Sequence, residues 1–212
     1  MTEITTRAER RKLATRQALV RAGQQLIAEG RTDVPVLTIT QVADVGMGSF
    51  YNHFQTKDEL YRAAVDEALE LQGLVLDAWT RDLDDPAEAF IRSFRMVGRL
   101  HRLQPRLSRV LLSRGPALAM SDHGLAPRAR RDLEHARDAG RFRFPDLESV
   151  LVIVAGATLM LGQAIHDRPD QDDAEMVDRV AEDLLRLLGL SDDEAAELAH
   201  QLLPPIEPAL GD

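Results

Sequence analysis

The sequence predicts an all-α protein, and three observations support this class. Apolar residues recur at the three- and four-residue spacing of helices along most of the chain. Thr6 with Glu9, and Thr56 with Glu59, have the spacing of capping boxes that open helices. No pair of strand-like segments joined by a hairpin turn is recognisable. The 212 residues, of which 44% are apolar, allow one large domain or a small domain joined to a larger one.

Four helical segments open the chain. The first covers residues 6–29, carries apolar residues along one face, and ends near Gly30. Two short helices follow at 36–43 and 47–54, separated by a tight turn, and a longer helix covers 56–79. The order of long helix, short helix, turn, short helix and long helix predicts a three-helix helix-turn-helix domain.

Six further helices and a short tail complete the prediction. Proline and glycine residues punctuate this part of the chain, and the expected helices cover residues 87–103, 106–114, 127–139, 146–166, 174–188 and 191–203. The helix at 146–166 is mostly apolar, but polar residues interrupt it, so it is marginal for a membrane span. We therefore expect a buried helix there and no membrane association.

Composition and charge exclude several classes of protein. The chain has no cysteine, which excludes disulfides, thiolate metal sites and cysteine nucleophiles. No apolar segment follows the charged N-terminus, so we expect no signal peptide and a soluble, cytoplasmic protein. The net charge is −9, yet residues 1–57 carry eight basic and five acidic groups, a balance of +3 that leaves −12 for the remainder. This asymmetry favours a basic N-terminal part that contacts phosphate groups and an acidic remainder that does not.

Residues 38–60 carry polar and aromatic side chains that an ordinary pair of core helices does not need. Gly46 and Gly48 would let the start of a helix approach another surface closely, and free N–H groups at a helix start favour phosphate. The side chains suited to phosphate oxygens are Tyr51, His53 and Lys57. Those suited to base edges or the thymine methyl are Thr40, Gln41, Met47, Ser49 and Asn52, and Thr38 opens the same segment. Phe50, Phe54 and Leu60 are expected in the core instead.

A basic run precedes this segment. Arg7, Arg10, Arg11 and Lys12 could form a solvated helix face, or they could contact a nucleic-acid backbone or minor groove. Because the run stands directly before the helix-turn-helix segment, Arg10 and Arg11 join the candidate DNA contacts. Such contacts would set salt dependence more than sequence preference.

The segment resembles the signature of the TetR family of bacterial transcriptional regulators, and the resemblance in order and spacing covers about residues 6–70. The matching residues are Ile39, Ala43, Val45, Gly48, Ser49, Phe50, Tyr51, His53, Phe54, Thr56, Lys57 and Leu60. Three residues depart from the pattern: Thr40 replaces a small alanine, Asp44 a turn glycine, and Gly46 a serine or threonine cap. Aspartate tolerates the left-handed conformation, so we still expect the turn to form.

The resemblance implies an N-terminal three-helix DNA-binding domain on a larger helical ligand-binding and dimerisation domain. It implies a homodimeric repressor that binds a palindromic operator in double-stranded DNA and leaves it when an unidentified small-molecule effector binds. An activator, or a ligand-binding module of the same fold that has lost DNA contact, is the alternative. The DNA-binding domain is expected at 6–56 and a connecting helix at 57–82. The ligand-binding and dimerisation domain is expected at 83–203, and a tail at 204–212. Two copies of the chain are expected to pair through the helices at about 146–166 and 174–188.

The C-terminal part offers candidate ligand contacts. The candidates are Trp79, Phe90, Phe94, His101, Leu111, Met160 and Gln163, with a plain structural role as the alternative for each. The histidines have no metal-ligand spacing. The sequence also has no nucleophile elbow and no glycine-rich phosphate loop. We therefore expect no catalytic residues, no metal and no cofactor, and a protein that is not an enzyme.

Overall fold

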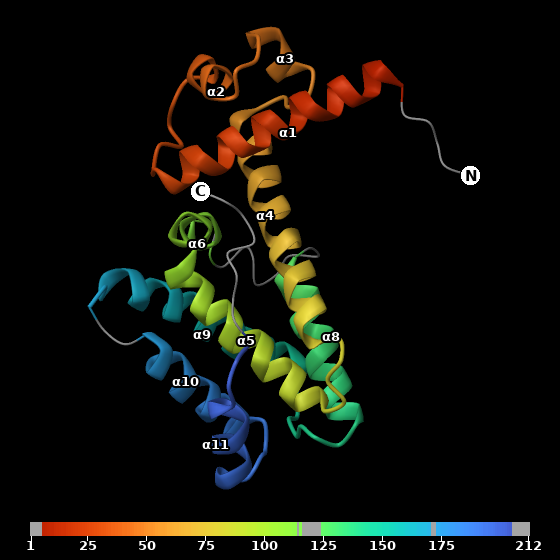
Figure 1. The fold of residues 1–212 in the computed structure, drawn as a ribbon, viewed down its shortest axis with the longest axis vertical. Helices are drawn as coiled ribbons and strands as arrows, with labels where there is room; N and C mark the ends of the chain where they lie inside the picture. The colour runs from red at the N-terminus through yellow and green to blue at the C-terminus, as the bar shows by residue number, and fades with distance from the viewer. Residues whose placement is uncertain (1–5, 114, 116–123, 171–172, 205–212) are drawn as a thin grey trace. The chain divides into compact units, whose positions relative to one another are not determined.

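The structure, a computed structural model, describes residues 6–113, 115, 124–170 and 173–204. In these residues the only regular secondary structure is helix, which confirms the predicted all-α class (Figure 1). The chain divides into two compact units, Met1–Ala68 and Leu69–Asp212. The division falls within one long helix, so this helix contributes residues to both units.

The first unit contains α1 (Arg7–Ala28), α2 (Val36–Val42), α3 (Met47–Tyr51) and the first half of α4 (Lys57–Thr80). The helix-turn-helix order predicted from the sequence is therefore confirmed. The helix predicted at 47–54 is shorter than expected, because after Tyr51 the chain tightens into a turn.

Local sequence determines where α1 and α4 begin. Thr6 Oγ1 accepts a hydrogen bond from Glu9 N at 3.2 Å, and the Glu9 carboxylate accepts one from Thr6 N at 2.7 Å, so the predicted capping box is confirmed. At α4, Thr56 Oγ1 accepts from Glu59 N at 3.1 Å. The Glu59 carboxylate accepts from Gln55 N at 2.7 Å instead of from the cap residue itself.

The core of the first unit draws on all four of these helices. Leu19 and Leu26 of α1, Ile39 of α2, Phe50 of α3 and Leu60 of α4 are fully buried. The apolar spacing of α1 places its leucines on one face, and burial of that face provides most of the stability of an amphipathic helix.

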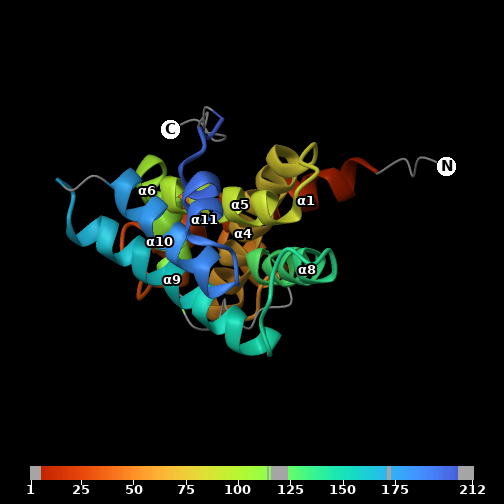
Figure 2. The same ribbon diagram turned by 90° about the horizontal axis from the view of Figure 1, so that it is seen from below.

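The second unit contains the rest of α4 and six further helices that the structure describes. These are α5 (Pro86–Leu103), α6 (Pro105–Leu112), α8 (Leu125–Asp138), α9 (Leu147–Asp167), α10 (Asp173–Leu187) and α11 (Asp192–His200). Helix α5 is central and packs against α6, α8, α9, α10 and α11 (Figure 2). The helix predicted at 127–139 begins two residues earlier, because the first N–H groups of a helix need no partner and Pro127 fits its first turn.

One buried ion-pair cluster joins α5 to α10. Arg95, which is almost completely buried, donates to Asp178 Oδ1 at 2.8 Å, and Arg99 donates to Asp178 Oδ2 at 2.8 Å. The opposite side of α5 carries Phe90 and Phe94 into the apolar core. Helix α5 is therefore fixed by apolar packing on one side and by charge on the other.

Helix α9 is only partly covered. Its inner face, which includes Val154, Leu161 and Ile165, is buried, whereas Val152 and Met160 on its outer face are 64% and 67% exposed. By length and composition alone α9 could cross a membrane, but core helices of soluble proteins pass the same test. Within the single chain, the expectation of a buried helix is confirmed for the inner face of α9, whereas the outer face is exposed.

Candidate nucleic-acid interface and ligand cavity

The turn between α2 and α3 has the predicted geometry. Asp44 adopts a left-handed conformation with φ 52°, as expected for the residue that replaces the family's turn glycine. Val45 N donates to Thr40 O at 3.0 Å and closes the turn. Gly46 is the N-cap of α3 and offers no side-chain cap, so the first N–H groups of α3 depend on the backbone or on an outside partner.

A buried aromatic cluster holds α3 in place. The Phe50 ring meets the Tyr51 ring edge to face, with centroids 5.3 Å apart, and lies 6.1 Å from the ring of Phe54. The guanidinium of Arg16 lies over the Phe54 ring at 5.5 Å. Leu60 is fully buried as well, so the predicted core positions of Phe50, Phe54 and Leu60 are confirmed.

The outer surface of α3 is open. Tyr51 is 60% exposed although its ring packs against Phe50. A Cβ added at Gly48 would meet no atom within 4 Å, so nothing within the described chain requires a glycine there. The candidates that are exposed are Arg10, Arg11, Gln41, Gly46, Met47, Gly48, Tyr51 and Asn52, while Thr38, Ser49 and His53 are half-buried.

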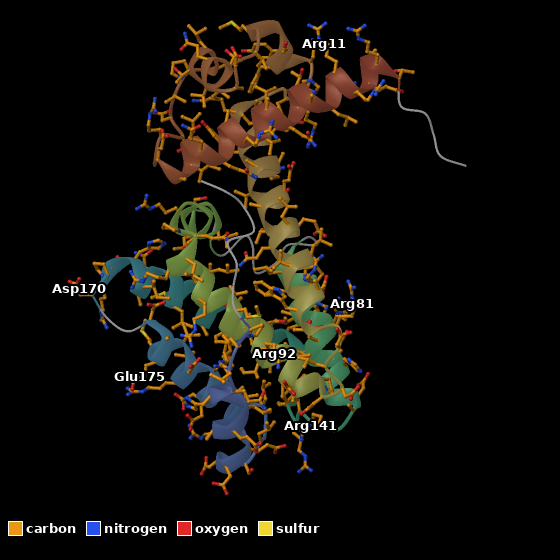
Figure 3. The ribbon with its side chains drawn as sticks, in the orientation of Figure 1. Arg11, Arg81, Arg92, Arg141, Asp170 and Glu175 are labelled. Atoms are coloured by element: carbon orange, nitrogen blue, oxygen red, sulfur yellow. The ribbon has the colours of Figure 1, made fainter. Side chains whose placement is uncertain are left out.

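The electrostatic environment of this surface is positive. Burial lowers the pKa of His53, and the charges of Lys12 and Arg16 on α1 lower it further. Arg11 extends from the exposed side of α1 (Figure 3). Lys12, Arg16 and the exposed Arg11 all belong to α1. These three side chains provide positive charge beside α3.

Two predicted contacts are engaged within the first unit. Thr40 is only 2% exposed, and its hydroxyl donates to Leu37 O at 2.9 Å. Lys57 Nζ donates to Val34 O at 2.9 Å and lies 3.6 Å from the Asp33 carboxylate. The structure therefore uses Thr40 inside α2 and Lys57 to hold the loop between α1 and α2.

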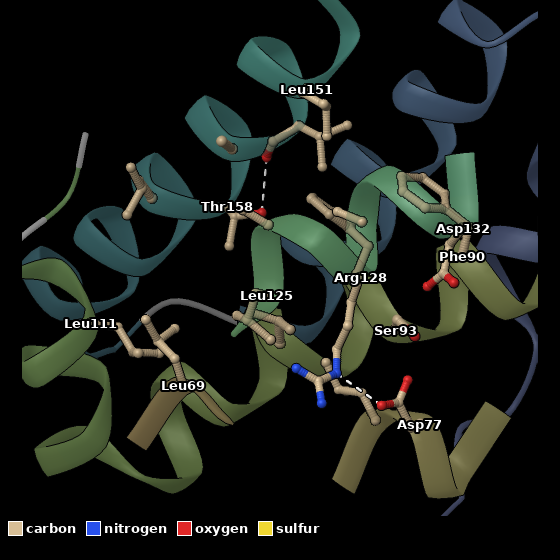
Figure 4. Close-up of a pocket in the computed structure, with 18 of the residues that line it drawn as sticks. Leu69, Asp77, Phe90, Ser93, Leu111, Leu125, Arg128, Asp132, Leu151 and Thr158 are labelled. Carbon is tan, nitrogen blue, oxygen red and sulfur yellow. Dashed lines mark hydrogen bonds and ion pairs between the residues drawn. The ribbon is translucent and has the colours of Figure 1, made fainter. Parts of the chain in front are cut away.

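The second unit contains a partly open cavity of about 130 Å³. Helices α4, α5, α6, α8 and α9 line it, and most of its wall is apolar. Figure 4 shows Leu69 and Leu111 at one end and Phe90 and Asp132 at the other. An engineered cavity of about 150 Å³ in another protein binds benzene, so this cavity is close to the size that a single aromatic ring needs.

A polar group of side chains from α4 and α8 forms one part of the cavity wall. Arg128 donates to Asp77 at 2.8 Å (Figure 4), and it also donates to Glu70 at 2.8 Å. The neighbouring Gly73 leaves room for the guanidinium, because a Cβ there would lie 2.4 Å from Arg128 Cζ. Burial raises the pKa of Asp132, although a hydrogen bond from Arg131 opposes the shift. These groups give the cavity a cation and an acceptor in a mostly apolar wall.

A second polar group lies where α5 meets α6 and α9. His101 also lines the cavity and is 2% exposed. Its Nδ1 lies 2.6 Å from Ser108 Oγ, which lies 2.7 Å from Nε2 of His166. Burial lowers the pKa of His101 to about 4, and the charge on His166 contributes in the same direction.

Comparison with known proteins identifies the family. A family model described as the tetracyclin repressor-like C-terminal domain matches residues 85–201, which is more than half of the chain. The chain belongs to the TetR family of transcriptional regulators. The resemblance seen in the first 70 residues is thereby confirmed from the other part of the chain.

Several solved structures are similar to most of this chain. RolR in complex with its ligand resorcinol is 32% identical, with a TM-score of 0.65 over 93% of this chain and 99% of that one. RolR without ligand is 33% identical, with a TM-score of 0.74 over 91% and 100%. The fatty acid degradation regulator FadR from Bacillus halodurans, at 17% identity and a TM-score of 0.63 over 82% and 93%, shares the fold. No curated protein sequence matches significantly.

Four of the seven predicted ligand contacts line the cavity of this TetR-family protein: Phe90, Phe94, His101 and Leu111. Trp79 does not, because it packs against Leu76 and Met96. Met160 and Gln163 lie on the exposed face of α9, and Gln163 donates to Asp167 instead.

The prediction also missed cavity residues. On α9 the residues that line the cavity include Leu151, Val154 and Thr158. Arg128, Asp77 and Asp132 were not predicted either. Only the spacing of Arg128 and Asp132, one helical turn apart on α8, could have suggested that they share a face.

Proposed function

We propose that this TetR-family protein is a homodimeric, sequence-specific DNA-binding repressor that a small-molecule effector releases from its operator. Residues 6–56 would form the DNA-binding domain, 57–82 the connecting helix, and 83–203 the ligand-binding and dimerisation domain. One observation carries the proposal: α3 presents an open surface of polar side chains and glycine on a base of buried aromatic rings.

The proposed DNA contacts follow from exposure and chemistry. Tyr51 and His53 bind phosphate oxygens, and the N–H groups at the start of α3 meet another phosphate because Gly46 provides no internal cap. Gly48 allows the DNA to approach α3 closely. The residues that contact base edges are the exposed or half-buried Thr38, Gln41, Met47, Ser49 and Asn52. Thr40 is left out because it is buried, and Lys57 acts by positioning the loop.

The basic residues of α1 support this surface. Arg10 and Arg11 are exposed, while Lys12 and Arg16 lie close enough to His53 to influence its pKa. A dimer with two such surfaces binds half-sites separated by about one helical turn of DNA or a multiple of it. The operator is therefore a palindrome.

A second copy of the chain covers the outer face of α9. Val152, Ile153 and Met160 are exposed on this face, and a Cβ at Gly156 would meet no atom within 4 Å. An apolar helix face of this length is unfavourable in water, whereas small residues allow close helix packing in an isologous dimer. Helix α10 flanks it with a charged surface that includes Arg179 and Glu175, which form an ion pair.

The effector is a small hydroxylated aromatic compound. The cavity holds about one ring, its wall is mostly apolar, and Asp132 and Arg128 can bind a hydroxyl group. RolR, which is 32% identical over most of this chain, has been solved with the ligand resorcinol. Helix α4 contributes Leu69 and Leu76 to the cavity wall and Leu60 to the core of the first unit. A movement of α4 on effector binding can therefore reach the DNA-binding helices.

Fluorescence anisotropy with labelled fragments of the DNA upstream of the chain's own gene tests the proposal. The expected result is salt-sensitive binding to one fragment, which unlabelled specific DNA competes and resorcinol or a related phenol reverses. Binding without release would support the fold's DNA-binding role and contradict the effector class. No binding to any fragment would favour a module that has lost DNA contact.

A further inference from the structure

The polar part of the cavity wall carries more negative than positive charge. The ionisable side chains among the described residues that line the cavity are Asp77, Arg128, Asp132 and His101. Burial lowers the pKa of His101 to about 4, so this imidazole is uncharged at neutral pH. Two carboxylates and one guanidinium remain, so the described lining carries an excess of negative charge.

The guanidinium of Arg128 is almost fully engaged by the protein itself. Nη1 donates to Gly124 O at 2.8 Å and to Glu70 at 3.1 Å, and Nη2 donates to Glu70 at 2.8 Å. Nε donates to Asp77 at 2.8 Å. Four of its five N–H groups are thus in use, and one remains for a ligand. A carboxylate is bound most strongly by two parallel N–H groups, so this arginine is poorly suited to an anionic ligand.

Asp132 retains an acceptor for a ligand. Its Oδ1 accepts a hydrogen bond from Arg131 Nε at 2.8 Å, whereas Oδ2 accepts none from the residues that the structure describes. The side chain is 19% exposed and lines the cavity, at the Phe90 end in Figure 4. A carboxylate oxygen accepts hydrogen bonds but donates none. A ligand hydroxyl supplies the donor, whereas a ligand carboxylate supplies no donor and adds a like charge.

We propose that this cavity selects its effector by charge, binding uncharged hydroxylated rings through Asp132 in preference to aromatic carboxylates. This inference rests on the proposed effector class and adds the property that separates effectors from their acidic relatives. Arg128 acts as a positioning residue, because Glu70 and Asp77 hold its guanidinium between α4 and α8. The same two carboxylates prevent it from attracting an anion.

Isothermal titration calorimetry on the full-length chain at neutral pH tests this selection. The compounds are resorcinol, meta-hydroxybenzoate and meta-hydroxybenzamide, whose amide has nearly the shape of the carboxylate but no charge. The wild-type protein should bind the amide at least about tenfold more tightly than the acid, the value of one hydrogen bond to a charged group. Equal affinities would overturn charge selection. Failure of both to bind would overturn it as well, because size would then exclude them.

Asp132→Asn removes the charge with little change in size. The ratio of acid to resorcinol affinity should rise at least about tenfold in this variant, because the like charge is gone. Asp138→Asn is the matched control, since it removes the same charge from the exposed end of α8 and should leave the ratio as in the wild type. An unchanged ratio in Asp132→Asn would overturn the role of Asp132.

Glu70→Ala provides a second test if Asp132→Asn does not fold by circular dichroism. Glu70 does not line the cavity, and its removal leaves N–H groups of Arg128 without an acceptor. The ratio of acid to resorcinol affinity should rise by a factor of about three or more. An unchanged ratio would contradict the proposed engagement of Arg128.

The resorcinol measurement separates this inference from the effector class on which it rests. If the wild-type protein does not bind resorcinol, the proposed effector class fails. If it binds resorcinol and binds meta-hydroxybenzoate equally tightly, the effector class stands and charge selection alone is overturned.

Discussion

Acidification should destabilise the second unit through His101. Burial lowers the pKa of His101 from 6.5 to about 4 in the folded protein. Between these two values the unfolded chain binds a proton that the folded chain does not, so stability is complete above pH 6.5 and is lost as the pH falls. Each pH unit below 6.5 costs about 1.4 kcal/mol, so lowering the pH from 7.5 to 5 should cost about 2 kcal/mol at this residue.

Urea denaturation at the two pH values measures this cost. Trp79 is the only tryptophan of the chain and packs in the second unit, so its fluorescence reports unfolding of that unit. His101→Asn removes the titrating ring and serves as the reference for every other ionisable group. The wild-type protein should lose about 2 kcal/mol more than His101→Asn between pH 7.5 and pH 5. Equal losses in the two proteins would refute the reasoning, because they would mean that His101 is protonated in the folded state.

Three further substitutions test other parts of the structure. Gly48→Ala should raise the melting temperature slightly, because alanine is favoured over glycine in a helix by up to about 1 kcal/mol. The same variant should bind DNA more weakly in anisotropy assays. Unchanged DNA binding would exclude a close approach of DNA to α3 at this residue. Light scattering should show that Met160→Arg is a monomer, whereas Leu74→Arg, at an exposed leucine of α4, should remain a dimer. A dimeric Met160→Arg would exclude the outer face of α9 as the dimer interface. Asp178→Ala should lower the free energy of unfolding by about 3 kcal/mol or more, because it leaves Arg95 buried without its partner. A loss below about 1 kcal/mol would show that water reaches the arginine.

Features that depend on neighbouring residues could be predicted from the sequence. The capping box of Thr6 and Glu9 joins residues three apart, and the turn at Asp44 depends on the conformational tolerance of one residue type. The core position of Phe50 follows from the family signature in the same short segment. Local patterns of this kind were sufficient to order the helices and to locate α3.

Features that depend on distant pairing could not be predicted. Met160 is exposed while Thr158, two positions earlier, lines the cavity, because successive residues of a helix point about 100° apart. A helix that is apolar on all sides, such as α9, gives no periodic signal for which face turns inward. The pairing of Arg128 with Asp77 joins residues 51 positions apart, and no local pattern indicates it.

The dependence of DNA binding on salt concentration tests the central claim most directly. The wild-type protein should bind its operator with an affinity that falls steeply as salt rises, since each phosphate contact adds about one unit to the logarithmic slope. Tyr51→Ala should weaken binding to every DNA sequence tested without altering the melting temperature, because Tyr51 is 60% exposed. Arg11→Ala should reduce the slope by about one. Wild-type binding that is insensitive to salt, or that Tyr51→Ala leaves unchanged, would contradict the assignment of α3 as the DNA-binding surface.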